Sequence, residues 1–168
     1  IPRVREGQIH WTPNSQQLSY NQIRQLPADT PETETYLDTT VFLLRKGQPE
    51  SRATPLFGPL VNKELKLERL DVAQVMFAPN SRYMIARTTD TTVPEGRLYV
   101  APLAALGRKD IAWRQIARAA DKITDAQLRG DTLYLRTYAG APRGRVLALA
   151  LNEPVLTKAR EVVAEPAA

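Results

Sequence analysis

The sequence contains one ten-residue pattern twice: Trp11–Tyr20 reads WTPNSQQLSY, and Phe77–Ala86 reads FAPNSRYMIA. Each copy begins with an aromatic residue, has Pro-Asn-Ser two positions later and continues into a short apolar run. A third, weaker copy, QLRGDTLYLR, begins at Gln127. Asn and Gly tolerate the left-handed backbone of tight turns, and Ser and Asp side chains can cap the amides of a turn. The repeat therefore predicts three hairpins, with turns at Asn14-Ser15, Asn80-Ser81 and Gly130-Asp131.

Short segments rich in aromatic, β-branched and aliphatic residues surround each turn, which favours strands. We expect three units, at about residues 8–58, 70–118 and 122–164, each with four antiparallel strands. The segments expected in strand order are QIHW, AQVMF or DAQL, then QLSY, YMIA or LYLR, then TVFLLRK, GRLYVAPL or GRVLALAL, and finally ATPLFG, AWRQIA or REVVAE. Such a recurring four-stranded unit is typical of β-propeller blades, so we predict an all-β, partial β-propeller of about three blades. A plain antiparallel sandwich with recurring hairpins is the alternative.

One segment also fits a helix. In RQIARAADKI, which begins at Arg114, the apolar residues have helical spacing, and propensity favours helix there. A helix would interrupt the fourth strand of the second unit. We therefore expect a strand from Trp113 to Ala117, followed by a turn.

The loop between the second and third strands is longest in the first unit, where it runs from Asn21 to about Thr40. It carries four acidic residues in a chain whose net charge is +5: Asp29, Glu32, Glu34 and Asp38. In a blade whose strands alternate in direction, this loop emerges on the same face as the connections between blades. We therefore expect binding or gating on that face, and solvated carboxylates within its loops.

Composition and motifs exclude several kinds of chemistry. The chain has no Cys and one His, His10, which we expect to be packed or hydrogen-bonded, so neither a cysteine nucleophile nor a metal site is predicted. No G-x-S-x-G elbow or phosphate-binding loop is present, and no cofactor is expected. Arg129-Gly130-Asp131 is interpreted as a hairpin turn and not as a cell-adhesion motif.

The basic residues are spread along the chain and do not gather into a stripe, so no nucleic-acid partner is expected. No apolar run approaches the roughly 20 residues that cross a bilayer, so no membrane partner is expected either. Taken alone, the chain is predicted to be non-catalytic.

Five collinear stretches resemble the propeller domain of prolyl oligopeptidases, serine peptidases of the S9 group, and the likeness is closest to bacterial members. These stretches span about Gln8 to Val163 and read IHWTPNSQQLSYNQI, PETETYLDTTVFLLRKG, VAQVMFAPNSRYMIARTT, GRLYVAPLAAL and APRGRVLALAL. The resemblance implies a seven-bladed propeller that screens an α/β-hydrolase domain from large folded proteins. This chain holds about three blades and no hydrolase domain, so we expect it to be a fragment of a longer peptidase with no catalytic residue of its own. A stand-alone propeller scaffold that binds peptides or proteins is the alternative.

The resemblance also implies where the chain contributes to function. In the family, the loop that corresponds to Asp29–Asp38 lies near the hydrolase domain. A substrate-gating role is therefore assigned to seven of its residues: Thr30, Pro31, Glu32, Thr33, Glu34, Tyr36 and Asp38. The expected partners are peptide substrates and the hydrolase domain. Bacterial relatives are often exported, which slightly favours a periplasmic over a cytoplasmic location. An arc of three blades leaves two terminal faces uncovered, so self-association through those faces is also expected.

Overall fold

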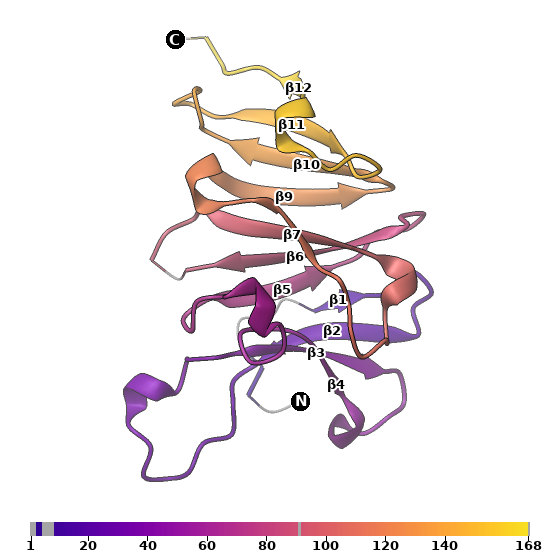
Figure 1. Ribbon diagram of the computed structural model, residues 1–168, viewed down its shortest axis with the longest axis vertical. Helices are drawn as coiled ribbons and strands as arrows, with labels where there is room; N and C mark the ends of the chain where they lie inside the picture. Colours follow the sequence, from indigo (N-terminus) through magenta and orange to yellow (C-terminus); the bar gives the residue numbers. More distant parts are fainter. Residues whose placement is uncertain (1–2, 5–8, 91, 168) are drawn as a thin grey trace. The chain divides into compact units, whose positions relative to one another are not determined.

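The computed structural model describes residues 3–4, 9–90 and 92–167 (Figure 1). The described residues form three four-stranded sheets and six short 3₁₀ helices, with no α-helix among them. The expected all-β class is therefore confirmed.

Each sheet follows the order of its strands in the sequence. The first contains β1 (His10–Trp11), β2 (Gln17–Gln22), β3 (Thr40–Arg45) and β4 (Thr54–Phe57). The middle sheet contains β5 (Val72–Met76), β6 (Tyr83–Thr89), β7 (Gly96–Pro102) and β8 (Arg114–Ala117). The third contains β9 (Ile123–Arg129), β10 (Thr132–Thr137), β11 (Arg145–Ala150) and β12 (Arg160–Val163). Every expected strand segment overlaps one of these strands, although Gln8, where the first was expected to begin, lies outside the described residues.

Six 3₁₀ helices lie in the connections. They are η1 (Glu32–Glu34), η2 (Glu50–Arg52), η3 (Lys63–Leu65), η4 (Leu103–Ala105), η5 (Ala119–Asp121) and η6 (Leu156–Lys158). The segment with helical spacing, which begins at Arg114, therefore forms β8 followed by the single turn of η5. Lys122 ends this turn with a φ of 52°. The interpretation of this segment as strand and turn is confirmed.

The three hairpin turns each contain one left-handed residue, but not always the expected one. The φ angle is 59° at Asn80 and 53° at Gly130, whereas in the first turn Ser15, with a φ of 54°, takes the place expected for Asn14. Asn14 caps that turn instead: its Oδ1 accepts hydrogen bonds from Thr12 Oγ1 at 2.8 Å and from Gln16 N at 3.1 Å. The two turn residues thus exchange roles in the first turn, where Thr12 supplies a donor to Asn14, whereas the second copy has Ala78 at that position.

The chain divides into two compact units, Ile1–Met76 and Phe77–Ala168. In the first unit, side chains of β2 bind the backbone of β5. Ser19 Oγ donates to the carbonyl oxygen of Val75 at 2.7 Å, and Asn21 Nδ2 donates to that of Ala73 at 2.9 Å. Because both pairs are buried, these bonds satisfy carbonyl groups that water cannot reach. They fix β5 against the first sheet.

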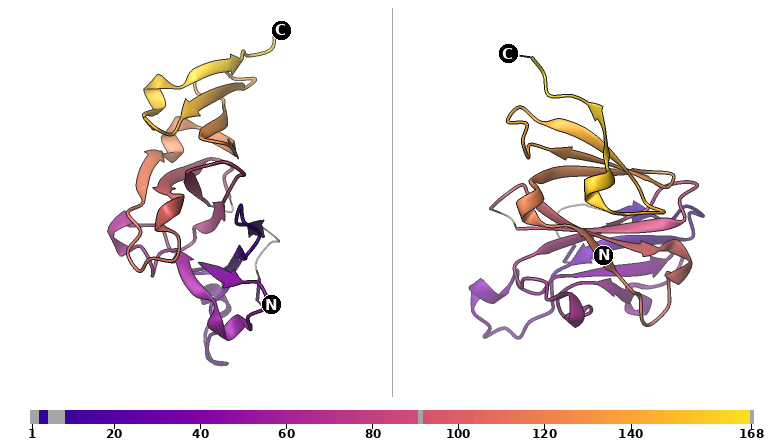
Figure 2. Two further views of the ribbon diagram at one scale, coloured as in Figure 1. Left: turned by 90° about the vertical axis from the view of Figure 1, so that its right-hand side faces the viewer. Right: turned by 45° about the horizontal axis from the view of Figure 1, so that its top comes forward.

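Figure 2 draws the third sheet, in the second unit, in orange to yellow. Its two faces carry different side chains, because successive residues of a strand point to opposite faces. One face is apolar and buried: Leu133 and Leu135 of β10 and Leu149 of β11 are at most 1% exposed. The opposite face is polar on β9 and β10, with Asp125 beside Arg136 and Gln127 beside Tyr134, whereas β11 contributes Val146 and Ala148 to it.

Candidate gating loop and its ion-pair anchor

The β2–β3 loop, which contains all seven predicted gating residues, projects from the first sheet as a turn and the 3₁₀ helix η1 (Figure 1). Pro31 precedes η1 with a φ of −55°, close to the value its ring imposes. Glu34 N donates to the carbonyl oxygen of Pro31 at 2.9 Å, and Thr35 N donates to that of Glu32 at 3.0 Å. Local hydrogen bonds thus give the tip of the loop a defined shape.

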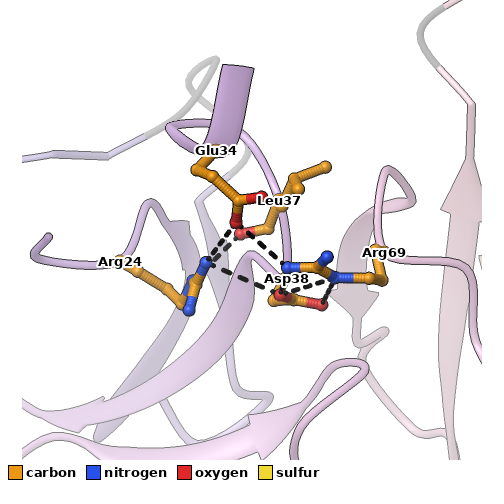
Figure 3. Close-up of polar contacts among 5 residues, drawn as sticks. All are labelled: Arg24, Glu34, Leu37, Asp38 and Arg69. Carbon is orange, nitrogen blue, oxygen red and sulfur yellow. Dashed lines mark hydrogen bonds and ion pairs between the residues drawn. The ribbon is translucent and has the colours of Figure 1, made fainter. Parts of the chain in front are cut away.

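Asp38 forms the base of this loop and is buried, with a side chain only 4% exposed. Its carboxylate receives a forked pair of bonds from Arg69, which lies between β4 and β5 (Figure 3). Arg69 Nη2 lies 2.8 Å from Asp38 Oδ2, and Arg69 Nε lies 3.1 Å from the same oxygen. A guanidinium that binds a carboxylate through two nitrogens fixes direction as well as distance.

Two further residues complete the cluster, which we call the anchor: Arg24, Glu34, Asp38 and Arg69 (Figure 3). Glu34 Oε2 lies 3.2 Å from Arg69 Nη2 and 3.6 Å from Arg24 Nη2. Arg24 Nη2 also lies 3.6 Å from Asp38 Oδ2, and Arg24 Nε donates to the carbonyl oxygen of Leu37 at 3.2 Å. Two carboxylates therefore alternate with two guanidinium groups, so no like charges need to be neighbours.

The backbone joins the same two segments. Asp38 N donates to the carbonyl oxygen of Arg69 at 2.7 Å, and Thr39 Oγ1 lies 3.4 Å from that of Asp71. Asp38 itself has a φ of 55°, a conformation that Asp tolerates better than most residues. The β2–β3 loop and the β4–β5 connection therefore lie on the same face of the first unit, as expected.

The electrostatics follow from these contacts. The hydrogen bond to Asp38, followed by the charge of that carboxylate, raises the pKa of Arg69 above its ordinary value. Arg69 is therefore charged at neutral pH.

The anchor corrects the expectation of solvated carboxylates in this loop. Asp38 is buried and Glu34 is half-buried and ion-paired, whereas Asp29 and Glu32 are exposed. The remaining predicted residues form the surface of the loop: Thr30 is half-buried, and Pro31, Thr33 and Tyr36 are exposed.

Sequence reasoning missed both arginines of the anchor. Arg24 lies in the same loop, two residues after β2, and its charge beside an acidic segment was a usable signal. Arg69 lies 31 residues beyond Asp38, among dispersed basic residues, and no local pattern indicates their pairing.

The other residues considered from the sequence have structural roles. His10 Nε2 lies 3.3 Å from Gln74 Oε1, which confirms a hydrogen-bonded histidine. Gly130 and Asp131 form the turn between β9 and β10, as interpreted, and Asp131 accepts bonds from Arg82 N at 2.7 Å and Arg82 Nε at 2.6 Å. Within residues 3–4, 9–90 and 92–167, no group of three His, Asp or Glu side chains is placed to hold a metal ion. No helix of the described part of the chain has the length and apolar character needed to span a membrane.

Comparison with known proteins defines the class of this chain. Three consecutive four-stranded sheets, each in the strand order of the sequence, match the N-terminal β-propeller domain of prolyl oligopeptidase, and the family model covers residues 1–168. The chain therefore belongs to the prolyl oligopeptidase family and is a part of its propeller domain. The predicted class, an all-β partial propeller, is confirmed.

Solved structures agree with this fold. Prolyl oligopeptidase B from Galerina marginata, bound to a 25-residue macrocyclization substrate, superposes with a TM-score of 0.80 at 16% identity, over 99% of this chain and 22% of that one. A structure from a study of two prolyl endopeptidases has a TM-score of 0.70 at 22% identity, over 95% of this chain and 22% of that one. The chain thus spans about a fifth of the length of these neighbours. A search of curated proteins finds no match.

Proposed function

We propose that this chain is the part of a propeller that screens peptide substrates for an α/β-hydrolase domain of the same protein, and that it is not catalytic by itself. Each sheet would be one blade, at about residues 8–58, 70–118 and 122–164. The family match over the whole chain supports this proposal, as does the much greater length of the structural neighbours.

Within that function, the β2–β3 loop gates the passage of peptides. The observation that carries this step is the contrast between its base and its tip: Asp38 is buried and bound at both backbone and side chain, while Glu32 and Tyr36 are exposed. A segment with a fixed base and an exposed tip can present its tip to a passing substrate without losing its place. The exposed acidic side chains Asp29 and Glu32 would disfavour acidic peptides at this point.

The first test is the coding sequence that follows residue 168. A G-x-S-x-G segment after further propeller sheets supports the peptidase, because that motif places a nucleophilic serine on a strand-to-helix turn. A stop codon after further sheets would instead support a stand-alone scaffold for peptides or proteins.

The gating step is tested in the longer protein that includes the hydrolase domain. We expect Asp38→Asn, which weakens the anchor, to raise kcat/KM for a long proline-containing peptide relative to a short one. Asp29→Asn, in the same loop but exposed, is the matched control and should leave the ratio unchanged. An Asp38→Asn enzyme that remains folded and keeps the wild-type ratio would contradict the gating role.

A further inference from the structure

The two copies of Pro-Asn-Ser differ in how the asparagine side chain is held. Asn14 Oδ1 accepts hydrogen bonds from Thr12 Oγ1 at 2.8 Å and from Gln16 N at 3.1 Å. Asn80 is exposed, and its side-chain amide has no hydrogen-bond partner in the part of the chain that the structure describes. The same tripeptide is therefore present with a restrained asparagine and with a free one.

The cause is the residue two positions before each asparagine. In the first copy this residue is Thr12, which is buried and donates its hydroxyl hydrogen to Asn14. In the second copy it is Ala78, which is also buried but has only a methyl group and cannot donate. One difference between the copies thus leaves the Asn80 side chain without the donor that Asn14 has.

The backbone nitrogen that follows each asparagine is also held differently. Ser15 N donates to the carbonyl oxygen of Thr12 at 2.8 Å, whereas Ser81 N donates to that of Ala78 at 3.3 Å. The longer hydrogen bond is the weaker one. Ser81 is buried, but a reaction between its nitrogen and the adjacent side chain of Asn80 requires no second molecule in the first step. Both reacting groups are therefore less restrained in the second copy.

We propose that Asn80 is a site of spontaneous deamidation and that the fold protects Asn14 from the same reaction. The nitrogen of Ser81 attacks Cγ of Asn80, so that an N–Cγ bond forms and the Cγ–Nδ2 bond breaks. The proton of Ser81 N leaves with Nδ2 as ammonia. Water then opens the cyclic imide at one of its two carbonyl carbons, which leaves an aspartyl or an isoaspartyl residue. This modification does not depend on the proposed gating function.

The other asparagines are poorer candidates for this reaction. The attack requires that the backbone nitrogen of the next residue be sterically accessible, which a small residue such as Ser permits. Asn21, Asn62 and Asn152 are followed by Gln, Lys and Glu, and the first two of them are buried. The reaction is therefore expected at the Asn-Ser pairs first.

Ring closure requires the asparagine side chain to rotate toward the following nitrogen. For Asn14 this rotation breaks both hydrogen bonds to Oδ1, whereas for Asn80 it breaks none that the structure describes. Two hydrogen bonds of ordinary strength slow the reaction at Asn14 by at least about tenfold relative to Asn80.

The test is an incubation of the 168-residue chain at mildly alkaline pH and below its melting temperature. Mass spectrometry of tryptic peptides follows each asparagine separately, because Arg24 and Arg69 lie between Asn14 and Asn80. We expect Asn80 to convert at least about tenfold faster than Asn14 in the folded chain and both to convert at similar rates in concentrated urea. Equal rates in the folded chain, or a difference that persists in urea, would overturn the proposal.

A variant tests the protection of Asn14 directly. Thr12→Val keeps the shape of the side chain but removes the hydroxyl, so it should accelerate conversion of Asn14 several-fold and leave Asn80 unchanged. Thr54→Val, which removes a hydroxyl from β4 in the same unit, is the matched control and should leave both rates unchanged. Conversion of Asn14 that is unchanged in folded Thr12→Val, or accelerated equally in both variants, would contradict the assigned protection.

Discussion

Arg69 holds Asp38 from outside the loop to which Asp38 belongs. The two residues are joined twice, by the side-chain pair at 2.8 Å and by the bond from Asp38 N to the carbonyl oxygen of Arg69 at 2.7 Å. Arg69 is 58% exposed and Asp38 is 4% exposed, so the pair connects the surface of the first unit to a buried position.

Replacement of Asp38 by Asn should destabilise the first unit. The amide keeps the left-handed backbone but loses the charge that Arg69 and Arg24 face, and hydrogen bonds to charged groups contribute about 1.5–3 kcal/mol. Since Arg69 is solvent-exposed, we expect a loss at the lower end of this range. Urea denaturation measures it, and Asp29→Asn should change the free energy of unfolding by less than about 0.5 kcal/mol. An equal effect of the two variants would contradict the assignment of the anchor.

The pH dependence of stability should change in Asp131→Asn. The hydrogen bond from Arg82 N, followed by that from the Arg82 side chain, lowers the pKa of Asp131. A carboxyl whose pKa is lower in the folded state stabilises the protein above the unfolded value of about 3.9, and this contribution is lost as pH falls through the folded value. The variant should therefore lose less stability than wild type between about pH 5 and pH 2. Thermal melts at several pH values measure this difference, and Asp125→Asn, which changes an exposed carboxylate, is the control. If the melting temperature of Asp131→Asn falls with pH in parallel with that of wild type, the prediction is wrong.

Removal of the Tyr20 hydroxyl should not destabilise the protein. Tyr20 is 1% exposed, its ring stacks on Phe42 with centroids 6.0 Å apart, and its Oη has no hydrogen-bond partner among the described residues. Because that hydroxyl is desolvated without compensation, Tyr20→Phe should be neutral or stabilising by up to about 1 kcal/mol at neutral pH.

Alkaline pH offers a second measurement on Tyr20. Burial is the main cause that raises its pKa, so its neutral form stabilises the fold below the unfolded value of about 10, and that contribution is lost as pH rises. Ultraviolet titration should show one late-ionising tyrosine that is absent from Tyr20→Phe. If Tyr20→Phe is destabilised and its ultraviolet titration matches that of wild type, the Tyr20 hydroxyl has a hydrogen-bond partner and the prediction is wrong.

Self-association is expected to be weak and reversible. The exposed face of the third sheet combines polar side chains of β9 and β10 with Tyr134, Val146 and Val163, and Val163 is 55% exposed. Light scattering over a concentration series should show a dimer that Val163→Asp weakens without a change in melting temperature. A monomer at every concentration would exclude association through the terminal faces.

The strands and turns could be predicted because their signals are local. Pro-Asn-Ser and Gly-Asp stop one strand and start the next within a few residues, so each hairpin is encoded by its own segment. The anchor could not be predicted from such local signals, because Arg69 and Asp38 are 31 residues apart and β3 and β4 lie between them in the sequence.

The double-mutant cycle of Asp38→Asn and Arg69→Gln, read by amide hydrogen exchange of the β2–β3 loop, tests the central claim most directly. If the pair holds the loop, either single variant should accelerate exchange of residues 34–39, and the double variant should be little faster than the singles. Additive acceleration, or exchange that is unchanged in all three variants, would show that the loop keeps its place without the anchor.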